Sequence, residues 1–418
     1  MANRTVVNMR ILHTSDWHLG RTFHGVELLS DQRRMLADIA AIVAAKSVDV
    51  VVVAGDVYDR SVPSADAVSV YDAGLGDIAA AGAQIVVTSG NHDSPTRLGA
   101  ASAFAAAGGL HLRTSVAAID TPVVLDDEFG PVAFYGIPYL EPDAVAKAFD
   151  IHAPCSHQGV LGAAMERVRA DATIRGARTV VAAHAFVSGA VSTGSERSIS
   201  VGGVETVAAE TFSGIDYVAL GHLHSPQEIA PAVRYSGSPM PYSFGENSHR
   251  KGVWIVDLDA DGVTDIRLHE LSGVRGLSSL RGTLDELLGD EKYADAREHY
   301  IEATLTDTIR PLDAMRRLRE RFPYAVHVHW ERPEALRLDY RSRIRGRTDA
   351  EIIAAFVGDV RDEPSAAERD LIERALREVV GEPEVVEAGA ADVEAREVSE
   401  ADQGQWALFA LETDSKSA

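Results

Sequence analysis

The sequence predicts an α/β protein with a metal site at the carboxyl ends of its strands. The run Val50–Ala54 shows no period-2 alternation, which indicates a strand buried on both faces by helices. Five such apolar runs end in Asp, Asn or His, often after a Gly or another small residue. Open α/β sheets bind their ligands at this edge. Oxygen and imidazole side chains repeated there, without a Ser or Cys nucleophile, indicate a metal site.

The residues at these strand ends are the candidate metal ligands. One Asp after a strand is equally typical of a helix N-cap or a turn, so no single position carries the prediction. The prediction depends on the recurrence of the pattern. In chain order the candidates are Asp16, His18, Asp56, Asn91, His184, His222 and His224.

The N-terminal part of the chain predicts alternating strands and helices. We expect a strand from Arg10, a helix over 31–45, a strand over 49–54, a helix from Ser64 to Ala80, a strand over 84–88 and a helix over 95–107. The helices are expected from apolar stripes of period 3.6 and from Ser64 as an N-cap. Strand, helix and strand in this order predict parallel pairing with a right-handed crossover.

The next part predicts a second sheet. Short β runs separated by turn residues fill 110–140 and 232–270, on either side of a helix over about 157–170, with strands leading to His184 and His222. We expect these runs to form a sheet packed on the first one. A Gly- and Ser-rich segment, 188–203, follows His184; it is either a surface loop or a substrate-side loop in which Arg197 contacts phosphate.

The C-terminal part predicts smaller units. Residues 276–335 read as a small α/β unit, and 310–347 hold eleven Arg against five acidic residues. Capping boxes at Thr348 and Ser365 open two short helices, to about Val357 and Val380, each with an apolar stripe. From 381 onward the chain is acidic and poor in aromatic residues, so we expect a disordered tail, with a small apolar patch at 406–411.

Composition limits the possible functions. A net charge of −23 argues against a protein that coats nucleic acid by bulk electrostatics, so a DNA enzyme would need local basic patches, metal ions or a basic partner. The single Cys155 excludes an intrachain disulfide framework and thiolate clusters. With no apolar leader in MANRTVVNMRIL and no membrane-length stretch, we expect a cytoplasmic protein that does not interact with membranes.

The motifs resemble those of a known family. The series D-x-H at 16–18, G-D-x-x-D at 55–59, G-N-H-D at 90–93, a lone His184 and G-H-x-H at 221–224 resembles the calcineurin-like metallophosphoesterases. Within that family, ILHTSDWHLG at 11–20 and ALGHLH at 219–224, followed by SGSP, resemble the SbcD or Mre11-type nucleases. The motifs span about residues 10–240 in the order and spacing of the family.

The resemblance implies a fold and a two-metal site. The fold is a four-layer α/β/β/α sandwich with a small α/β capping domain and C-terminal helices. One divalent ion would be held by Asp16, His18, Asp56 and His224, and the other by Asp56, Asn91, His184 and His222, with Asp56 bridging. The resemblance implies Mn²⁺, whereas ligand chemistry alone leaves Mg²⁺, Fe and Zn open.

The resemblance also implies roles beside the metals. His92 would stabilise or protonate the leaving oxygen and Asp93 would orient it, although His92 can also be read as a structural turn residue. An imidazole suits this task because its pKa lies near neutrality. His24 and Arg197 are candidates for substrate contact. Asp59 is read as a supporting residue and not as a ligand.

The implied function is that of an SbcD-like subunit of an SbcCD-type nuclease. It would hydrolyse DNA phosphodiesters in repair and recombination, as an exonuclease on duplexes and an endonuclease on single strands and hairpins. It would form a homodimer within a heterotetramer with an SbcC/Rad50-like ATPase. The alternatives are a calcineurin-like phosphatase or cyclic-nucleotide phosphodiesterase, and a metal-stabilised scaffold without turnover.

We expect four parts in the chain. These are a nuclease domain at 1–275, a capping domain that holds DNA at 276–347, a helical partner-binding segment at 348–380 and the acidic tail at 381–418. Isolated helices as short as the two in 348–380 are marginal in water, so their stripes should pack on the nuclease or on another protein. The resemblance favours the ATPase, with Phe356 and Leu376 as anchors.

Overall fold

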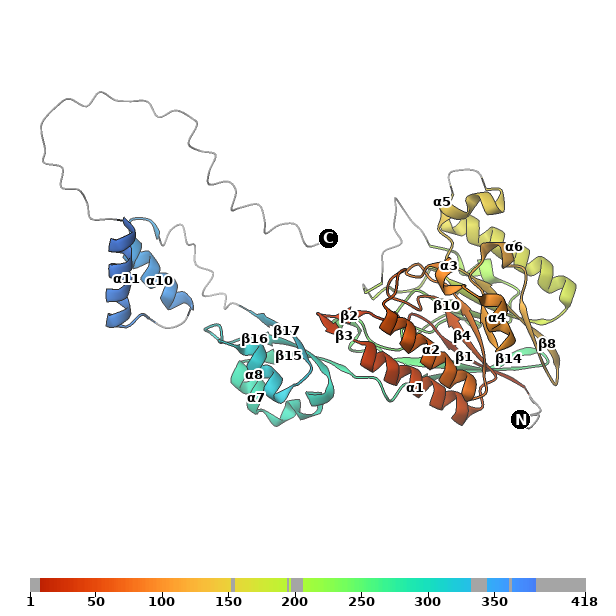
Figure 1. Cartoon of the computed structure of the whole chain (residues 1–418), viewed down its shortest axis with the longest axis horizontal. Helices are drawn as coiled ribbons and strands as arrows, with labels where there is room; N and C mark the ends of the chain where they lie inside the picture. The colour runs from red at the N-terminus through yellow and green to blue at the C-terminus, as the bar shows by residue number, and fades with distance from the viewer. Residues whose placement is uncertain are drawn as a thin grey trace, which may run out of the picture. The chain divides into compact units, whose positions relative to one another are not determined.

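The structure is a computed structural model that describes residues 8–151, 155–193, 195–196, 206–331, 344–360 and 363–380. Arg197 and the tail 381–418, with its apolar patch, lie outside these ranges. The chain divides into two compact units, 1–337 and 338–418 (Figure 1).

The first sheet of the larger unit contains the strands that precede Asp16, Asp56 and Asn91. Its strand order is β14-β13-β1-β4-β5-β6. The strands are β1 (Met9–Thr14), β4 (Val50–Ala54), β5 (Gln84–Thr88), β6 (Leu110–Leu112), β13 (Gly252–Asp259) and β14 (Gly262–Glu270). Because β1, β4, β5 and β6 run parallel, their carboxyl ends lie at one edge; β13 is antiparallel to β1.

The second sheet contains the strand that ends at His184 and the strand that precedes His222. Its order is β11-β12-β10-β9-β8-β7. The strands are β7 (Val123–Asp127), β8 (Gly130–Ile137), β9 (Arg178–His184), β10 (Tyr217–Gly221), β11 (Gln227–Ala230) and β12 (Val233–Tyr235). Strands β8, β9, β10 and β12 run parallel, with antiparallel strands at both edges.

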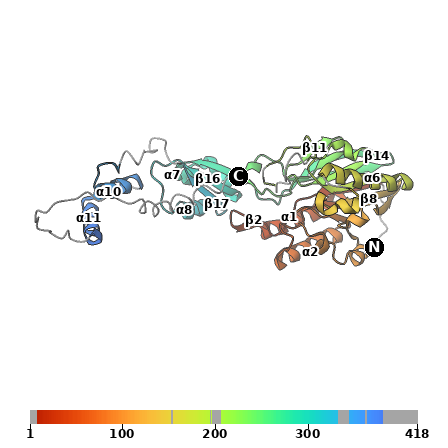
Figure 2. The same ribbon diagram turned by 90° about the horizontal axis from the view of Figure 1, so that it is seen from above.

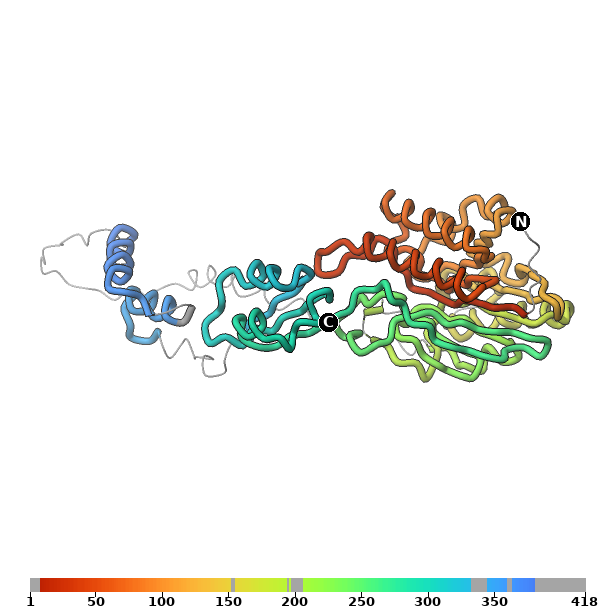
Figure 3. The backbone as a smooth tube through the Cα atoms, turned by 90° about the horizontal axis from the view of Figure 1, so that it is seen from below, coloured from red at the N-terminus to blue at the C-terminus, as the bar shows by residue number. Residues whose placement is uncertain are grey.

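Alternating side chains of the strands divide between two cores. Val51 and Val53 pack toward helices α1 (Leu29–Lys46) and α2 (Ala65–Ala80), whereas Val50 and Val52 face the second sheet. The second sheet is covered on its outer face by α6 (His157–Arg175). Helix, sheet, sheet and helix give the predicted four-layer sandwich, visible in Figures 2 and 3.

Shorter elements connect these layers. They are the hairpin β2 (Thr22–Phe23) and β3 (Val26–Glu27), helices α3 (Pro95–Leu98), α4 (Ser102–Ala107) and α5 (Pro142–Val145), and the 3₁₀ helices η1 (Val116–Ala118), η2 (Ala146–Phe149), η3 (Ala209–Phe212) and η4 (Phe244–Glu246).

Two predictions about this unit were wrong. The helix expected over 95–107 is divided into α3 and α4, because Ala101 takes a left-handed φ of 57° and Gly99 packs against Thr114. The runs expected to form the second sheet are shared between both sheets: β6 extends the first sheet beyond β5, and β13 and β14 extend it beyond β1. A β pattern shows that a strand is half-buried but does not identify its neighbour.

Residues 277–330 form the predicted small α/β unit. It has parallel strands β15 (Leu277–Gly282), β16 (Tyr300–Leu305) and β17 (Ala325–Trp330), helices α7 (Leu284–Gly289) and α8 (Ala314–Arg321), and the 3₁₀ helix η5 (Glu291–Glu298). It contacts the sandwich through Tyr300, whose hydroxyl donates to Asp31 of α1 at 2.5 Å. Arg275 stacks on Tyr324, 3.3 Å from the ring centroid.

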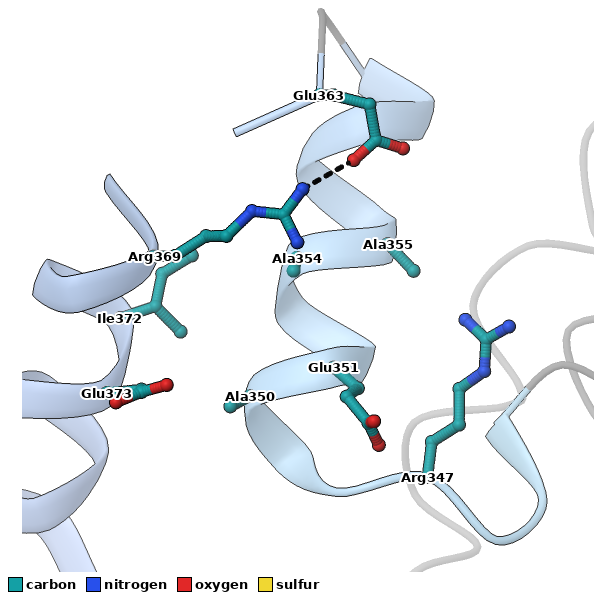
Figure 4. Close-up of a pocket in the computed structure, with 9 residues that line it drawn as sticks. All are labelled: Arg347, Ala350, Glu351, Ala354, Ala355, Glu363, Arg369, Ile372 and Glu373. Atoms are coloured by element: carbon teal, nitrogen blue, oxygen red, sulfur yellow. Dashed lines mark hydrogen bonds and ion pairs between the residues drawn. The ribbon is translucent and has the colours of Figure 1, made fainter. Parts of the chain in front are cut away.

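The second unit contains two short helices, α10 (Asp349–Val360) and α11 (Ala366–Val380). Both predicted capping boxes are present, because Glu351 accepts from the backbone of Thr348 and Glu368 from that of Ser365, each at 2.8 Å. A pocket of about 300 Å³ lies between the helices, where Ala350 and Ala354 of α10 face Ile372 and Glu373 of α11 (Figure 4).

Much of the apolar surface of this helix pair stays exposed within its unit. Phe356 is 57% exposed, Leu371 59% and Val379 83%, while Leu376 is half-buried.

Within the described ranges of the whole chain, no helix combines the length and the apolar character needed to cross a bilayer.

Candidate metal centre

The loops that follow β1 and β4 run side by side and present the first ligands. The backbone N–H of Asp16 donates to the carbonyl of Gly55 at 3.0 Å, and that of His18 donates to the carbonyl of Asp56 at 3.0 Å. These bonds continue the parallel pairing of the two strands beyond their ends. They hold three candidate ligands at fixed separation before any metal binds.

The backbone at the candidate ligands is strained. Asp16, His18, Asp56 and His222 have φ values of 54°, 43°, 51° and 109°, in the region that favours glycine. Such conformations cost of order 1–3 kcal/mol each, persist only where surrounding structure enforces them, and cluster at functional sites. Four such residues, where strand ends of the two sheets meet, indicate a functional site.

Two glycines bring the strand ends together. A Cβ on Gly221 would lie 1.9 Å from the carbonyl oxygen of Ala54, so the end of β10 meets the end of β4 only because residue 221 has no side chain. A Cβ on Gly90 would lie 2.1 Å from an Asp56 oxygen. The small residues before the ligands in the sequence are therefore required by close approach of two backbones.

One group of candidate ligands contains Asp16, His18 and His224, all buried. One potential ligand atom of each lies within 4.8 Å of the others. The Nε2 atoms of His18 and His224 face each other at 3.1 Å. The structure thus brings together three of the four residues expected at the first ion, and the fourth, Asp56, lies 3.7 Å from His18 Nε2.

A second group contains Asp16, Asp56 and His184. The Nδ1–H of His184 donates to the carbonyl of Ala54 at 3.0 Å, which leaves its Nε2 without a proton in the neutral ring. This Nε2 faces Asn91 Oδ1 at 2.9 Å and Asp56 Oδ2 at 3.5 Å. Three acceptor atoms converge here, as expected for ligands of a shared cation.

His222 lies beside this second group. Its backbone N–H donates to both oxygens of Asp16 at 3.1 Å, and its ring meets that of His184 edge-on, with centroids 5.3 Å apart. The structure therefore places it next to Asp16 and His184.

Burial determines the charge states of these groups. Burial lowers the pKa of His18 and of His222 well below the usual range, and the charges of neighbouring histidines act in the same direction. Burial also lowers the pKa of His184, although Asp56 opposes it. The rings are thus held neutral, which is the form that binds metal ions.

Burial shifts the pKa of a carboxyl group in the opposite direction from that of a histidine. Burial and the nearby charge of Asp56 raise the pKa of Asp16 well above its usual range. Buried carboxylates close to one another are costly unless a cation compensates them. Neutral imidazoles, an amide oxygen and two carboxylates form a donor set that fits divalent ions such as Mn²⁺.

His92 faces the same centre. Its Nε2 lies 4.0 Å from Asp56 Oδ2, and its backbone N–H donates to Asp56 Oδ1 at 2.9 Å. Its Nδ1–H donates to the carbonyl of Asp59 at 2.9 Å. The ring is thus oriented by a backbone carbonyl, with Nε2 directed toward the candidate ligands.

The structure places Asp93 on backbone amides and not on the ring of His92. Its carboxylate accepts from the N–H groups of Val57 at 3.1 Å, Tyr58 at 2.9 Å and Gly90 at 2.9 Å. Burial and Asp56 raise its pKa to about 7 despite these hydrogen bonds. Asp93 joins the loop after β4 to the loop after β5 and fixes His92 indirectly.

The candidate substrate residue His24 lies away from the metal groups. His24 is exposed, with a φ of 47°, and its ring stacks on that of His327 in the small α/β unit, centroids 5.0 Å apart. It lies at the contact between the two parts of the larger unit, outside the metal groups.

Sequence reasoning missed a set of polar residues behind His224. They are Ser195, Glu196, Glu246 and Lys251, with Arg21 beside them. For Asp59, which is predicted to be a supporting residue, one potential ligand atom lies within 4.8 Å of such atoms of His18 and His92. Ser195, Glu196, Glu246 and Lys251 stand outside the strand-end pattern of the sequence, so no local signal distinguishes them.

Fold and site together define a metal-dependent phosphoester hydrolase. Residues 9–226, more than half of the chain, match the family model of the calcineurin-like phosphoesterases, and the chain belongs to this family. Residues 274–361 match a second model, SbcD_C, described as the type 5 capsule protein repressor C-terminal domain. The two matches together confirm the resemblance to the SbcD or Mre11-type members.

Solved structures similar to this chain come from several organisms. TT1561 of Thermus thermophilus has 14% identity and a TM-score of 0.39, covering 63% of this chain and 100% of its own. GAP50, the anchor in the inner membrane complex of Plasmodium, has 11% identity and a TM-score of 0.39, with 79% and 98% covered. A dimetal phosphatase from Danio rerio has 12% identity and a TM-score of 0.36, with 64% and 100% covered.

Proposed function

We propose that the chain is an SbcD-like nuclease subunit that hydrolyses DNA phosphodiesters in repair and recombination. The observation that carries this proposal is the combination of a buried two-group metal centre with a C-terminal region that matches the SbcD_C model. A phosphatase for small substrates would need the centre alone. We assign 1–275 to the nuclease domain, 276–347 to the capping domain, 348–380 to partner binding and 381–418 to an acidic tail.

The centre would hold two divalent ions, which we propose to be Mn²⁺, through the seven candidate ligands. Bound ions supply positive charge to the phosphate oxygens and lower the pKa of bound water. Asp56 is placed to contact both ions because it lies near His18 on one side and His184 on the other. Asp16 and Asp56 are held by the paired loops, so the geometry is prepared in advance.

His92 would act on the leaving oxygen. Its Nδ1–H is held by the Asp59 carbonyl, so a proton for the leaving oxygen would come from the imidazolium form, which carries a second proton on Nε2, the nitrogen that points to the centre. Its side chain is 15% exposed, so a substrate oxygen can reach it. Asp93 keeps the ring in place by holding the two flanking loops.

Several of the described arginines of the small α/β unit already have partners within that unit. Arg316 pairs with Glu320 at 2.9 Å, and Arg317 pairs with Asp285 at 3.0 Å. Arg321 donates to the carbonyls of Leu287 and Asp290. Given the net charge of −23, we propose that the metal ions and the partner supply most of the attraction for the substrate.

We propose that the partner is an SbcC/Rad50-like ATPase, in a heterotetramer with two copies of this chain, in the cytoplasm. The support is the exposed apolar surface of α10 and α11 and the match to SbcD_C, which includes α10. Helix pairs with exposed apolar stripes suit a helix-in-groove interaction.

The substrate class can be tested directly with Mn²⁺. Plasmid DNA, a single-stranded circle, a DNA hairpin, cyclic AMP and p-nitrophenyl phosphate are incubated with wild type and with Asp56→Asn. We expect cleavage of the DNA substrates only, abolished in the variant. Efficient turnover of cyclic AMP or of the phenyl phosphate with intact DNA would favour the phosphodiesterase or phosphatase alternative, and no turnover of any substrate would favour a scaffold.

A further inference from the structure

The residues behind His224 hold it at three atoms. Its backbone N–H donates to Glu196 Oε1 at 3.0 Å, and its carbonyl accepts from Lys251 Nζ at 2.7 Å. Its Nδ1 lies 2.7 Å from Ser195 Oγ. His224 is only 1% exposed, so these partners and the facing His18 define the ring environment.

Ser195 connects the ring to a buried ion pair. Its Oγ lies 2.5 Å from Glu246 Oε1, and Glu246 Oε2 lies 2.5 Å from Lys251 Nζ. The side chains of Glu246 and Lys251 are 0% and 7% exposed. A carboxylate paired with an ammonium at this distance is ionised, so Glu246 can only accept hydrogen bonds.

The direction of this hydrogen-bond chain follows from proton counting. Ser195 has one hydroxyl proton, and Glu246 has none to offer, so the hydroxyl donates to Glu246. The nearby Thr193 hydroxyl donates to Glu196 Oε1 at 2.8 Å and is not available to the ring. The Ser195 oxygen must therefore accept from His224, which places the ring proton on Nδ1.

The tautomer determines whether Nε2 of His224 can bind a metal ion. With the proton on Nδ1, His224 Nε2 presents its lone pair toward His18 Nε2 at 3.1 Å and into the group formed with Asp16. With the proton on Nε2, this nitrogen would be a donor and could not bind a metal in the group with Asp16 and His18. Supporting hydrogen bonds of this kind typically fix the tautomer of a ligating histidine.

We propose that Ser195 and Glu246 are positioning residues that fix His224 as the Nδ1–H tautomer and so complete the first metal group. The proposal rests on the proposed function in one respect, because it takes His224 as a metal ligand. It also gives the segment after His184 a role: the described residues Ser195 and Glu196 fasten it to the centre, and Arg21 reinforces it by donating to the Ser195 carbonyl at 3.2 Å.

The tautomer can be read in the metal-free full-length chain by ¹⁵N NMR of labelled histidine. The His224 resonance is identified by its absence in His224→Gln. We expect the Nδ1–H pattern in wild type and in Ser195→Thr, which keeps the hydroxyl. Ser195→Ala should give the Nε2–H form or a mixture. Unchanged Nδ1–H resonances in Ser195→Ala would overturn the proposal.

Calorimetric titration with Mn²⁺ provides the second readout. Ser195→Ala should weaken one of the two Mn²⁺ sites by about 10–100-fold and leave the other near wild type, and Ser195→Thr should recover most of the loss. The matched control is Ser188→Ala, which removes a hydroxyl of the same segment that donates to the Val207 carbonyl. An equal loss in Ser188→Ala would overturn the proposal, because the effect would then reflect the segment as a whole.

These readouts separate the proposal from the proposed function. Neither measurement uses DNA. If the chain fails to cut DNA but shows the expected tautomer and Mn²⁺ affinities, the proposed function is contradicted and the role of Ser195 stands. If the wild-type chain cuts DNA but Ser195→Ala retains both the Nδ1–H tautomer and the two Mn²⁺ sites, the proposed function stands. The role proposed for Ser195 is then contradicted.

Discussion

Asp56 lies near candidate ligands of both metal groups. Its Oδ2 is 3.5 Å from His184 Nε2 and 3.7 Å from His18 Nε2. We expect Asp56→Asn to lose binding of both Mn²⁺ ions and all nuclease activity with the fold retained, because an amide replaces a carboxylate that lies between His18 and His184. Calorimetry gives the metal stoichiometry and circular dichroism the fold. Two intact sites in this variant would contradict the assignment.

His92 should behave differently from the ligands. Since its Nδ1 bonds to a carbonyl and its Nε2 lies 4.0 Å from Asp56, we expect His92→Ala to keep near wild-type Mn²⁺ content. Cleavage should fall by roughly 10²–10⁴-fold, the usual contribution of a general acid or base. Metal content and the rate on single-stranded DNA are measured on the same samples; near-normal turnover would return His92 to a structural role.

His13 gives a prediction about acid stability. It is fully buried on β1, its Nε2–H donating to the Leu220 carbonyl and its Nδ1 accepting from Tyr217, and burial lowers its pKa to about 3. The folded-state pKa is thus below the unfolded value near 6.5. Its stabilisation is fully present above pH 6.5 and is lost as pH falls toward 3, by roughly 1.4 kcal/mol per pH unit.

The test compares wild type with His13→Gln in urea, with a chelator, at pH 7 and pH 5. Wild type should lose more free energy of unfolding than the variant between these pH values, because only wild type carries the titrating ring. Equal losses in the two proteins would show that His13 does not contribute to the acid sensitivity.

Single residues differ in how far the sequence could predict them. The structure brings Asp16, His18, Asp56, Asn91 and His184 together, because each lies at or just beyond the end of an apolar strand and the strand ends of the two sheets meet. The partners of His224 were not predictable in this way. Ser195 and Glu246 are 29 and 22 positions from it, and their contact depends on how two loops fold over the sheet edge.

At the scale of elements, the junction between β4 and β10 determines how closely the two sheets approach. In Gly221→Ala, the new methyl group would meet the Ala54 carbonyl, which cannot move without displacing β4. We expect the free energy of unfolding to fall by about 1–3 kcal/mol or more, with weaker Mn²⁺ binding, because His184 also lies against this position.

Gly76→Ala is the matched control for this substitution. Residue 76 lies within α2, and nothing is within 4 Å of a Cβ placed there. Since alanine favours helix more than glycine does, we expect this variant to gain about 0.5–1 kcal/mol. Urea denaturation measures both variants; a stable Gly221→Ala protein with normal Mn²⁺ affinity would show that the sheets can separate without cost.

Elements were predictable in so far as their signals are local. The N-cap of α2 at Ser64 and the capping boxes at Thr348 and Ser365 occur where the sequence places them. The sheet to which β13 belongs is not a local property. Its pairing with β1 depends on contacts between distant parts of the chain, such as Arg10 with Asp257 at 2.6 Å.

At the scale of the whole molecule, the two units predict separable activities. A chain ending at Arg347 removes α10 and α11, with the exposed Phe356 and Leu371. We expect it to keep Mn²⁺-dependent cleavage of single-stranded DNA, because the metal centre lies wholly in 1–337. It should fail to co-purify with an SbcC/Rad50-like ATPase and lose ATP-stimulated cleavage of duplex ends.

Phe356→Asp in the full-length chain provides the control for truncation. It keeps both helices but places a charge at the proposed anchor, so complex formation should weaken while metal binding is unchanged. A truncated chain that still forms the stable complex, or one that unfolds, would contradict this division of roles.

The position of β13 beside β1 also has a consequence for synthesis on the ribosome. Arg10 and its partner Asp257 are 247 residues apart, so at roughly 5–20 residues per second β1 waits about 12–50 s for its neighbour. During that interval the first sheet has an unpaired edge whose N–H and C=O groups can pair with another nascent chain. Slowing translation upstream of residue 252 should therefore increase aggregation of this protein in cells, and a holdase chaperone should relieve it.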